Sequence, residues 1–159
     1  MRNLHLLIQR LADSGVDFVI VGGFASVLHG SSYVTEDLDI CAVLSPENIE
    51  RLRVAFGDLK PVHRMTHKKL SFLEHPAAGA PLANLYLETG AGVLDVLGSV
   101  LGLGGYEALA RNAIEVPLFG RKCRVVALED LIRAKEAMGR EKDLLTAKEL
   151  RAIAAKRAQ

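Results

Sequence analysis

The sequence predicts an α/β or α+β fold with a single mixed sheet flanked by helices. Short runs rich in Val, Ile and Leu, bounded by glycines or polar turns, indicate strands, whereas other segments carry apolar residues at helical spacing. The two kinds of segment occur in mixed order, which favours one sheet covered by helices. The chain has 159 residues, of which 50% are hydrophobic, so we expect one domain with its own core over residues 1–159.

The N-terminal elements are a helix, a buried strand and a second helix. Apolar residues recur at helical spacing over residues 4–12, and Gly15 follows as a helix end. Residues 17–21 (DFVIV) form a short apolar run that two glycines follow at once, which is typical of a buried strand. Residues 24–28 again show helical spacing and end at Gly30. The glycine pair therefore opens a helix directly after a strand.

The next strand carries two aspartates in VTEDLDICAV. Side chains at i and i+2 of a strand share a face, so Asp37 and Asp39 project side by side. Leu38 and Ile40 then point the other way, into a core. Two adjacent carboxylates repel, and a divalent cation with oxygen ligands relieves that repulsion. A metal site is one interpretation, and an exposed strand end or helix cap without a ligand is the other.

The remaining elements follow from caps and hairpin patterns. Ser45 as N-cap and Pro46 at the first position begin a helix that runs to about Phe56. Farther along we expect two strand pairs and two closing helices: strands 84–88 and 93–97, strands 114–119 and 123–126, and helices from 128 to 138 and from about 142 to the end.

The turn at Gly22 and Gly23 is a candidate anion site. Backbone N–H groups and the helix dipole at a helix start favour an anion, and the missing side chains let a phosphate approach. Ser26, one turn into the helix, would add a hydroxyl, unless it is an ordinary packing residue. The alternative for the glycines is a tight turn that needs their backbone angles. Neither G-x-G-x-x-G nor G-K-S/T occurs, so the turn is no dinucleotide fingerprint or P-loop.

A third carboxylate, Asp95, lies in the run GVLDVLGSVLGL. We expect this strand to be apolar on both faces, where an acid is costly unless it is paired or bound to a metal. Asp95 would then be a third ligand, on a strand next to that of Asp37 and Asp39. A buried salt bridge to Lys or Arg, or a position at the sheet edge, would explain the same residue without a metal.

The order of the glycine pair, T-x-D-x-D and the strand aspartate resembles the DNA polymerase β-like nucleotidyltransferase superfamily. The likeness is to its small bacterial members, including the nucleotidyltransferase domain of AbiEii-type toxins. It covers residues 16–97 and continues weakly over residues 125–150. The resemblance implies the minimal nucleotidyltransferase fold, with closing helices from about residue 128. This chain departs from the pattern at Gly23, where many members have serine, and at Tyr33, where close relatives often have arginine.

The resemblance implies an enzyme that transfers an NMP from an NTP to an acceptor hydroxyl, with two Mg²⁺ ions or with Mn²⁺. In that case catalysis and metal binding rest on Asp37, Asp39 and Asp95. Nucleotide binding rests on Gly22, Gly23, Ser26, Thr35 and Lys135. The acceptor stays open among a protein, a tRNA and a small molecule. A partner protein or a second copy of the chain would help to bind the acceptor.

The departures leave a second interpretation open. A catalytically weak or inactive module would keep the fold and bind a nucleotide or a partner chain within a toxin–antitoxin-type system. A third interpretation is that the carboxylates hold only a structural ion.

Two basic segments are ambiguous as well. Residues 63–69 (HRMTHKK) either line the cleft or form a solvated loop, and Lys135 either reaches the triphosphate or stays outside, while Glu136 and Arg140 are spaced to pair on a helix surface.

Composition narrows the class of protein. The net charge of +1 argues against a strong overall attraction to nucleic acid. No apolar stretch is long enough for a membrane span and no signal peptide precedes Asn3, so we expect a cytoplasmic protein without membrane contact. Cys41 and Cys123 lack a C-x-x-C spacing and are expected to be buried and reduced. His63 and His67 have helical metal spacing, but their basic neighbours favour a solvated segment.

Overall fold

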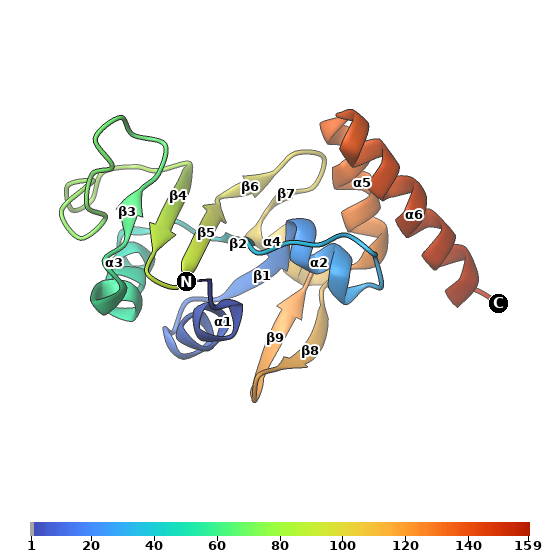
Figure 1. The fold of residues 1–159 in the computed structure, drawn as a ribbon, viewed down its shortest axis with the longest axis horizontal. Coiled ribbons are helices and arrows are strands. Elements are labelled where there is room, and N and C mark those ends of the chain that lie inside the picture. Colours follow the sequence, from blue (N-terminus) through green and yellow to red (C-terminus); the bar gives the residue numbers. More distant parts are fainter. Residues whose placement is uncertain (1) are drawn as a thin grey trace.

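The computed structural model describes residues 2–159 (Figure 1). The elements follow in this order: α1 (Leu4–Asp13), β1 (Phe18–Val21), α2 (Gly22–Leu28), β2 (Leu38–Ala42), α3 (Pro46–Phe56), the 3-10 helix η1 (Gly57–Leu59), β3 (Val62–His63), β4 (Asn84–Thr89), β5 (Gly92–Leu97), β6 (Ser99–Val100), β7 (Gly104–Gly105), α4 (Tyr106–Asn112), β8 (Ile114–Leu118), β9 (Arg121–Val125), α5 (Leu128–Met138) and α6 (Glu141–Arg157). No helix within this range combines the length and the apolarity that a membrane crossing needs.

Seven strands form one mixed sheet in the order β3-β4-β5-β2-β1-β9-β8, and β6 and β7 form a separate two-stranded ribbon. Strand β2 pairs antiparallel with β1 and parallel with β5, and β1 pairs parallel with β9. The predicted fold, a single mixed sheet flanked by helices, is confirmed. Because β2 lies between β1 and β5, residues from these three strands meet near the middle of the sheet.

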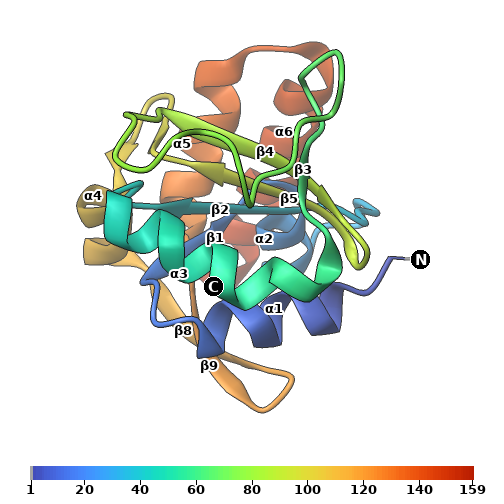
Figure 2. The same ribbon diagram turned by 90° about the vertical axis from the view of Figure 1, so that its left-hand side faces the viewer.

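Part of the core lies between the sheet and helices α1 and α3, which lie together on one face (Figure 2), and buried residues of α2, α4, α5 and α6 extend it. Leu38 and Ile40 of β2 are fully buried, which agrees with their predicted orientation, and the intervening Asp39 projects to the opposite face. Helices α5 and α6 pack against each other, and α5 contacts α2. Figure 1 shows this helix pair at the end of the molecule away from α3. Cys41 and Cys123 are buried free thiols, as expected.

The elements that were predicted from caps and from hairpin patterns are confirmed. Helix α3 begins after Ser45, whose Oγ accepts the N–H of Asn48 at 3.2 Å, and Pro46 occupies its first turn. Helix α5 has the predicted bounds, and the predicted strand pairs are β4–β5 and β8–β9. Helix α4 and the two-residue strands β3, β6 and β7 were not predicted, and these strands are too short to show a period. Asp37 lies just before β2 and not within it.

The expectation that β5 is apolar on both faces was wrong. Leu94 and Val96 are fully buried, whereas Val93, Asp95 and Leu97 are half-buried. One face of β5 therefore packs into the core, and the other face borders open space. The apolar residues on that second face misled the prediction because Leu97 lines a cavity instead of packing under a helix.

Candidate active site

Three aspartates meet on the open face of the sheet. Asp39 and Asp95 are register partners in the parallel pair β2–β5. Asp37 lies two residues before Asp39 and on the same side of the chain. All three line one cavity of about 340 Å³. The structure thus brings together the three carboxylates that the sequence singled out, from two neighbouring strands.

The glycine turn permits two close approaches. Gly22 has a φ of +70°, and a Cβ at this position would lie 2.2 Å from Oδ2 of Asp39. A Cβ on Gly23 would lie 2.8 Å from the ring of Tyr33 and 3.2 Å from Cβ of Thr35. Position 22 therefore needs glycine for its backbone angle and for the approach of Asp39, whereas a side chain at position 23 would require the half-exposed Tyr33 to shift. The turn opens α2 directly after β1, as predicted, and Gly23 lines the cavity of the aspartates.

Two predicted nucleotide-binding hydroxyls line the same cavity but are engaged with backbone groups. Ser26 is fully buried, and its Oγ donates to the carbonyl oxygen of Gly22 at 3.3 Å. Thr35 Oγ1 donates to the carbonyl oxygen of Asp37 at 3.2 Å and accepts its N–H at 3.3 Å. Thr35 therefore fixes the backbone that leads into Asp37, whereas Ser26 stabilises the first turn of α2.

The surroundings of Asp39 disfavour the charged form of its carboxylate. Burial, followed by the charge of Asp95 and with a smaller part from Asp37, raises the pKa of Asp39 to about 6, although Lys135 and Arg64 act in the opposite direction. At neutral pH its negative charge is thus incompletely balanced. A bound cation would relieve this imbalance.

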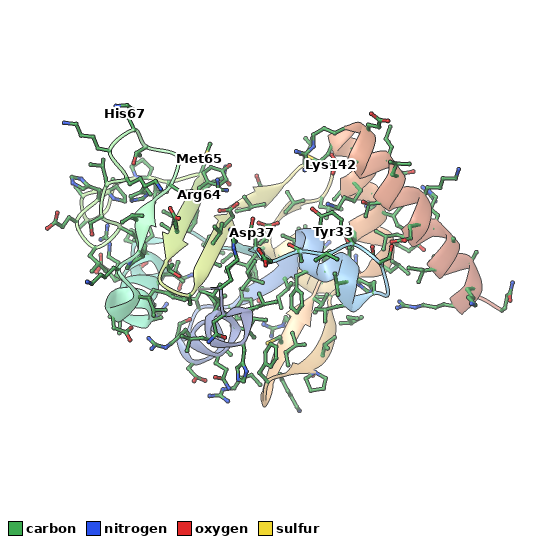
Figure 3. The ribbon with its side chains drawn as sticks, viewed as in Figure 1. Tyr33, Asp37, Arg64, Met65, His67 and Lys142 are labelled. Carbon is green, nitrogen blue, oxygen red and sulfur yellow. The ribbon has the colours of Figure 1, made fainter. Side chains whose placement is uncertain are left out.

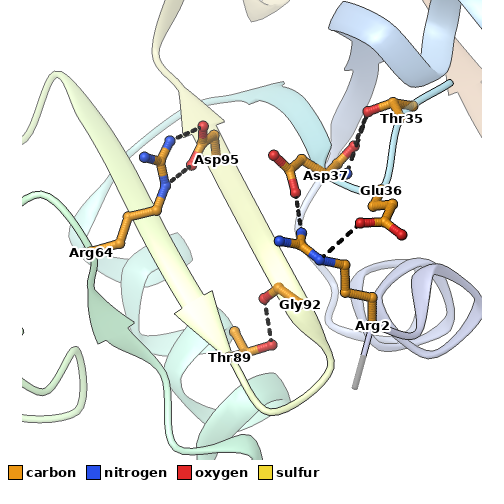
Figure 4. A network of polar contacts seen from close by, with 8 residues as sticks. All are labelled: Arg2, Thr35, Glu36, Asp37, Arg64, Thr89, Gly92 and Asp95. Carbon is orange, nitrogen blue, oxygen red and sulfur yellow. Dashed lines mark hydrogen bonds and ion pairs between the residues drawn. The ribbon is translucent and has the colours of Figure 1, made fainter. Parts of the chain in front are cut away.

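An arginine engages each of the other two carboxylates (Figure 4). Arg64 donates from Nε to Oδ1 of Asp95 at 3.2 Å and from Nη2 to Oδ2 at 2.5 Å. Arg2 pairs with Asp37 and also lies 3.1 Å from Glu36. Burial still raises the pKa of Asp95, because it outweighs the opposing effect of Arg64. The salt bridge that the sequence left open for Asp95 is therefore present, and residues 63–69 are not merely a solvated loop.

A cationic wall faces these pairs across the cavity. It is formed by the end of α5 and the start of α6, with Lys135, Arg140 and Lys142 among its residues. Figure 3 shows Arg64 and Lys142 on opposite sides of Asp37. Burial lowers the pKa of Lys135, and the charges of Asp143 and Asp39 partly offset this effect. Lys135 lines the cavity of the aspartates, and its approach to a triphosphate stays a prediction.

Sequence reasoning missed Asp143, which organises this wall. Its carboxylate is 1% exposed, accepts from Arg140 at 2.6 and 3.3 Å, and lies 3.8 Å from Nζ of Lys135. The expected pairing of Glu136 with Arg140 was wrong, because Glu136 instead accepts from Arg151 of α6 at 2.6 and 3.0 Å. The i,i+3 spacing of Arg140 and Asp143 is the signal that would have found the correct pair.

The residues at hand fit a magnesium site that is not preassembled. Asp37, Asp39 and Asp95 offer only carboxylate oxygens, the ligands that Mg²⁺ prefers, and Asp39 lacks a full counter-charge. Within residues 2–159, however, no three His, Cys, Asp or Glu side chains are arranged to hold a metal ion. The physical reason is that Arg2 and Arg64 engage the outer two carboxylates. A metal ion would have to displace these guanidinium groups.

Comparison with known proteins identifies the fold. No protein-family description matches the sequence, and no curated protein matches it either. Among solved structures, the lincomycin-bound lincosamide antibiotic adenylyltransferase LnuA is 19% identical, with a TM-score of 0.59 over 96% of this chain and 98% of that one. The antigenic nucleotidyltransferase-like protein from Paracoccidioides brasiliensis is 17% identical, with a TM-score of 0.54 over 94% and 72%.

A third solved structure, the antibiotic-resistance factor ANT(2'')-Ia, is 16% identical, with a TM-score of 0.53 over 98% of this chain and 89% of that one. At such identities the likeness establishes the fold and nothing finer. The chain therefore has the nucleotidyltransferase fold over nearly its whole length.

Proposed function

We propose that this protein is a metal-dependent nucleotidyltransferase, which transfers an NMP from an NTP to an acceptor hydroxyl. One observation carries the proposal. Within a nucleotidyltransferase fold, three carboxylates from neighbouring strands line the same cavity as three cationic side chains from α5 and α6. A phosphoryl-transfer site needs carboxylates that bind a divalent ion and, facing them, cations that bind the phosphates.

The residues divide between the two reacting groups. Lys135, Arg140 and Lys142, together with the Gly22–Gly23 turn, would bind the triphosphate. Asp37, Asp39 and Asp95 would hold Mg²⁺, with Mn²⁺ as an alternative. When bound, the ion neutralises phosphate charge and makes the acceptor hydroxyl more acidic.

Asp95 pairs with Arg64, and we assign it to the side of the cavity from which an acceptor would attack in line with the departing pyrophosphate. In the transfer, the acceptor oxygen forms a bond to the α-phosphorus as the bond to the bridging oxygen of pyrophosphate breaks. The hydroxyl proton passes to the carboxylate of Asp95. The pyrophosphate keeps its negative charge against Lys135 and Arg140.

Isothermal titration with each of the four NTPs, with Mg²⁺ and with EDTA, tests the proposal. We expect at least one NTP to bind with Mg²⁺ and not with EDTA, and Asp39→Asn to abolish this binding. The exposed Asp13, which pairs with Arg121 far from the cavity, provides a matched control as Asp13→Asn and should leave binding unchanged. Equal binding of NTP by wild type and Asp39→Asn would refute the metal site.

Two observations favour a second candidate, a weak or inactive module that binds a nucleotide or a partner chain in a toxin–antitoxin-type system. The bidentate bridge from Arg64 occupies both oxygens of Asp95, and Gly23 offers no hydroxyl to a phosphate. Incubation with labelled NTPs and a cell lysate separates the candidates. Label transferred to a protein, a tRNA or a small molecule supports the enzyme and names its acceptor. Nucleotide binding without transfer to any lysate component supports the module.

A further inference from the structure

A second cavity, of about 320 Å³, adjoins the cavity of the aspartates. The two share Asp39, Lys135 and Arg140 as common lining residues. The second cavity has a different character, because aliphatic side chains from β5, the β6–β7 ribbon and α5 form most of its wall, among them Leu97, Val100, Leu103, Leu131 and Ala134. Asn84 and Ser99 add polar groups to it. We call the cavity of the aspartates the polar chamber and the second cavity the apolar chamber. The two chambers meet at one carboxylate and two cations.

The β6–β7 ribbon lies directly against α5 and closes the apolar chamber. Gly102 in the ribbon turn has a φ of +85°, and a Cβ there would lie 2.9 Å from Cβ of Ala137 and 3.5 Å from the carbonyl oxygen of Arg133. Two large apolar side chains remain exposed at the chamber. Leu101 of the same turn is 61% exposed, and Met138 at the end of α5 is 45% exposed. An apolar ligand between them would remove both from water.

We propose that the apolar chamber binds the nucleoside of the NTP, with its base held between Leu101 and Met138. This inference rests on the proposed nucleotidyl transfer and deepens it. The α-phosphorus reacts beside Asp39, and it joins the triphosphate chain to the nucleoside. Since the cations draw the phosphates into the polar chamber, the nucleoside extends into the apolar chamber. Apart from Asp39 and the two cations that both chambers share, the described residues that line the apolar chamber are uncharged.

The position of Asp95 assigns the acceptor to the other side. Asp95 lines the polar chamber and is absent from the lining of the apolar one. An acceptor hydroxyl next to Asp95 therefore approaches from the Arg64 side. The volume of the apolar chamber lies at the lower end of the usual range for small-molecule sites, which suits a base and a sugar.

The test compares an NTP with inorganic tripolyphosphate, which carries the phosphates without the nucleoside. Leu101→Ser and Met138→Ser change exposed side chains, and thermal unfolding checks that both variants fold. With Mg²⁺ present, we expect the double variant to bind its NTP about tenfold more weakly by titration calorimetry. Tripolyphosphate binding should stay within about twofold of the wild type. Val54→Ser, at an equally apolar and 85% exposed site on α3, is the matched control and should alter neither affinity.

The outcomes separate this inference from the function on which it rests. Unchanged NTP affinity in the double variant would overturn the nucleoside assignment. If the KM for the acceptor rose instead, the chamber would be the acceptor site. If the wild type bound neither NTP nor tripolyphosphate with Mg²⁺, the nucleotidyltransferase proposal itself would fail, and the variants would not be needed to show it.

Discussion

Replacing Asp39 by asparagine should stabilise the metal-free protein. The pKa of Asp39 is about 6 in the fold against 3.8 for an ordinary aspartate, so its negative charge favours the unfolded chain above that pH. A shift of this size corresponds to about 3 kcal/mol at neutral pH. This figure already includes the favourable charges of Lys135 and Arg64, which act to lower the pKa. For a chain of this length we expect the melting temperature to rise by about 6–12 °C.

The pH dependence follows from the same shift. Because the folded-state pKa is raised, the wild type regains stability as the pH falls from about 6 towards 3.8, while the asparagine variant has no such carboxylate to protonate. The advantage of Asp39→Asn should therefore be fully present at pH 8, about half as large at pH 5, and nearly lost near pH 3.8. Comparing the two proteins at each pH cancels the contribution of His29, whose pKa burial lowers and whose protonation destabilises the fold on acidification.

Thermal unfolding in EDTA, followed by circular dichroism at pH 8 and pH 5, measures both effects. Asp13→Asn is the control of opposite sign, because hydrogen bonds from Arg121 lower the pKa of Asp13, and loss of that charge should not stabilise the protein. Mg²⁺ should raise the melting temperature of the wild type only, since the ion binds the folded site. An Asp39→Asn protein that melts below the wild type at pH 8 in EDTA would refute the reasoning.

Three further substitutions probe the neighbouring residues. Asp95→Asn should reduce transfer by orders of magnitude in a product assay but leave NTP affinity within a few fold, and it should not lower the unfolding free energy at neutral pH, because burial raises the pKa of Asp95 in spite of Arg64. Gly23→Val should lower both melting temperature and NTP affinity by driving its side chain against Tyr33, and adding Tyr33→Ala should restore the melting temperature if that contact is the cause. Glu149→Ala should weaken NTP binding, measured by calorimetry, because Glu149 holds the segment that leads to Asp37.

The sequence predicted those parts of the site that local rules govern. The period of a strand places Asp37 and Asp39 on one face, and a glycine pair after a buried run opens α2. Caps likewise gave the start of α3. In each case the relevant physics acts within a few residues, so one stretch of sequence contains the whole signal.

The partners of the carboxylates could not be predicted in the same way. Arg64 is 31 residues from Asp95 in the chain, and its approach depends on how the segment between β3 and β4 folds back. Either a metal ion or an arginine can neutralise a buried aspartate, and the sequence is compatible with both. The apolar chamber could not be predicted either. The glycine-rich run that forms β6 and β7 has the sequence of a loop, and only the structure shows that Gly102 packs against α5.

Helix α6 links the two walls of the candidate active site. It buries few apolar side chains, and polar contacts bind it to the segment between α2 and β2. Glu149 accepts from the N–H of Ser32 at 3.1 Å and from its Oγ at 2.7 Å, and it also accepts from the Ser31 hydroxyl. Arg157 donates to the carbonyl oxygen of His29 at 2.9 Å and to Nδ1 of the same residue at 3.3 Å.

These contacts assign the proton of His29 and show why the link is firm at neutral pH. Since Arg157 donates to Nδ1, the imidazole is neutral with its proton on Nε2, which donates to the carbonyl oxygen of Val126 at 2.7 Å. The first turn of α6 contributes Asp143 to the cationic wall, and its later turns hold the segment that ends at Asp37. Any displacement of α6 would therefore disturb both the cations that we propose for the phosphates and the segment before Asp37, which we propose for the metal ion.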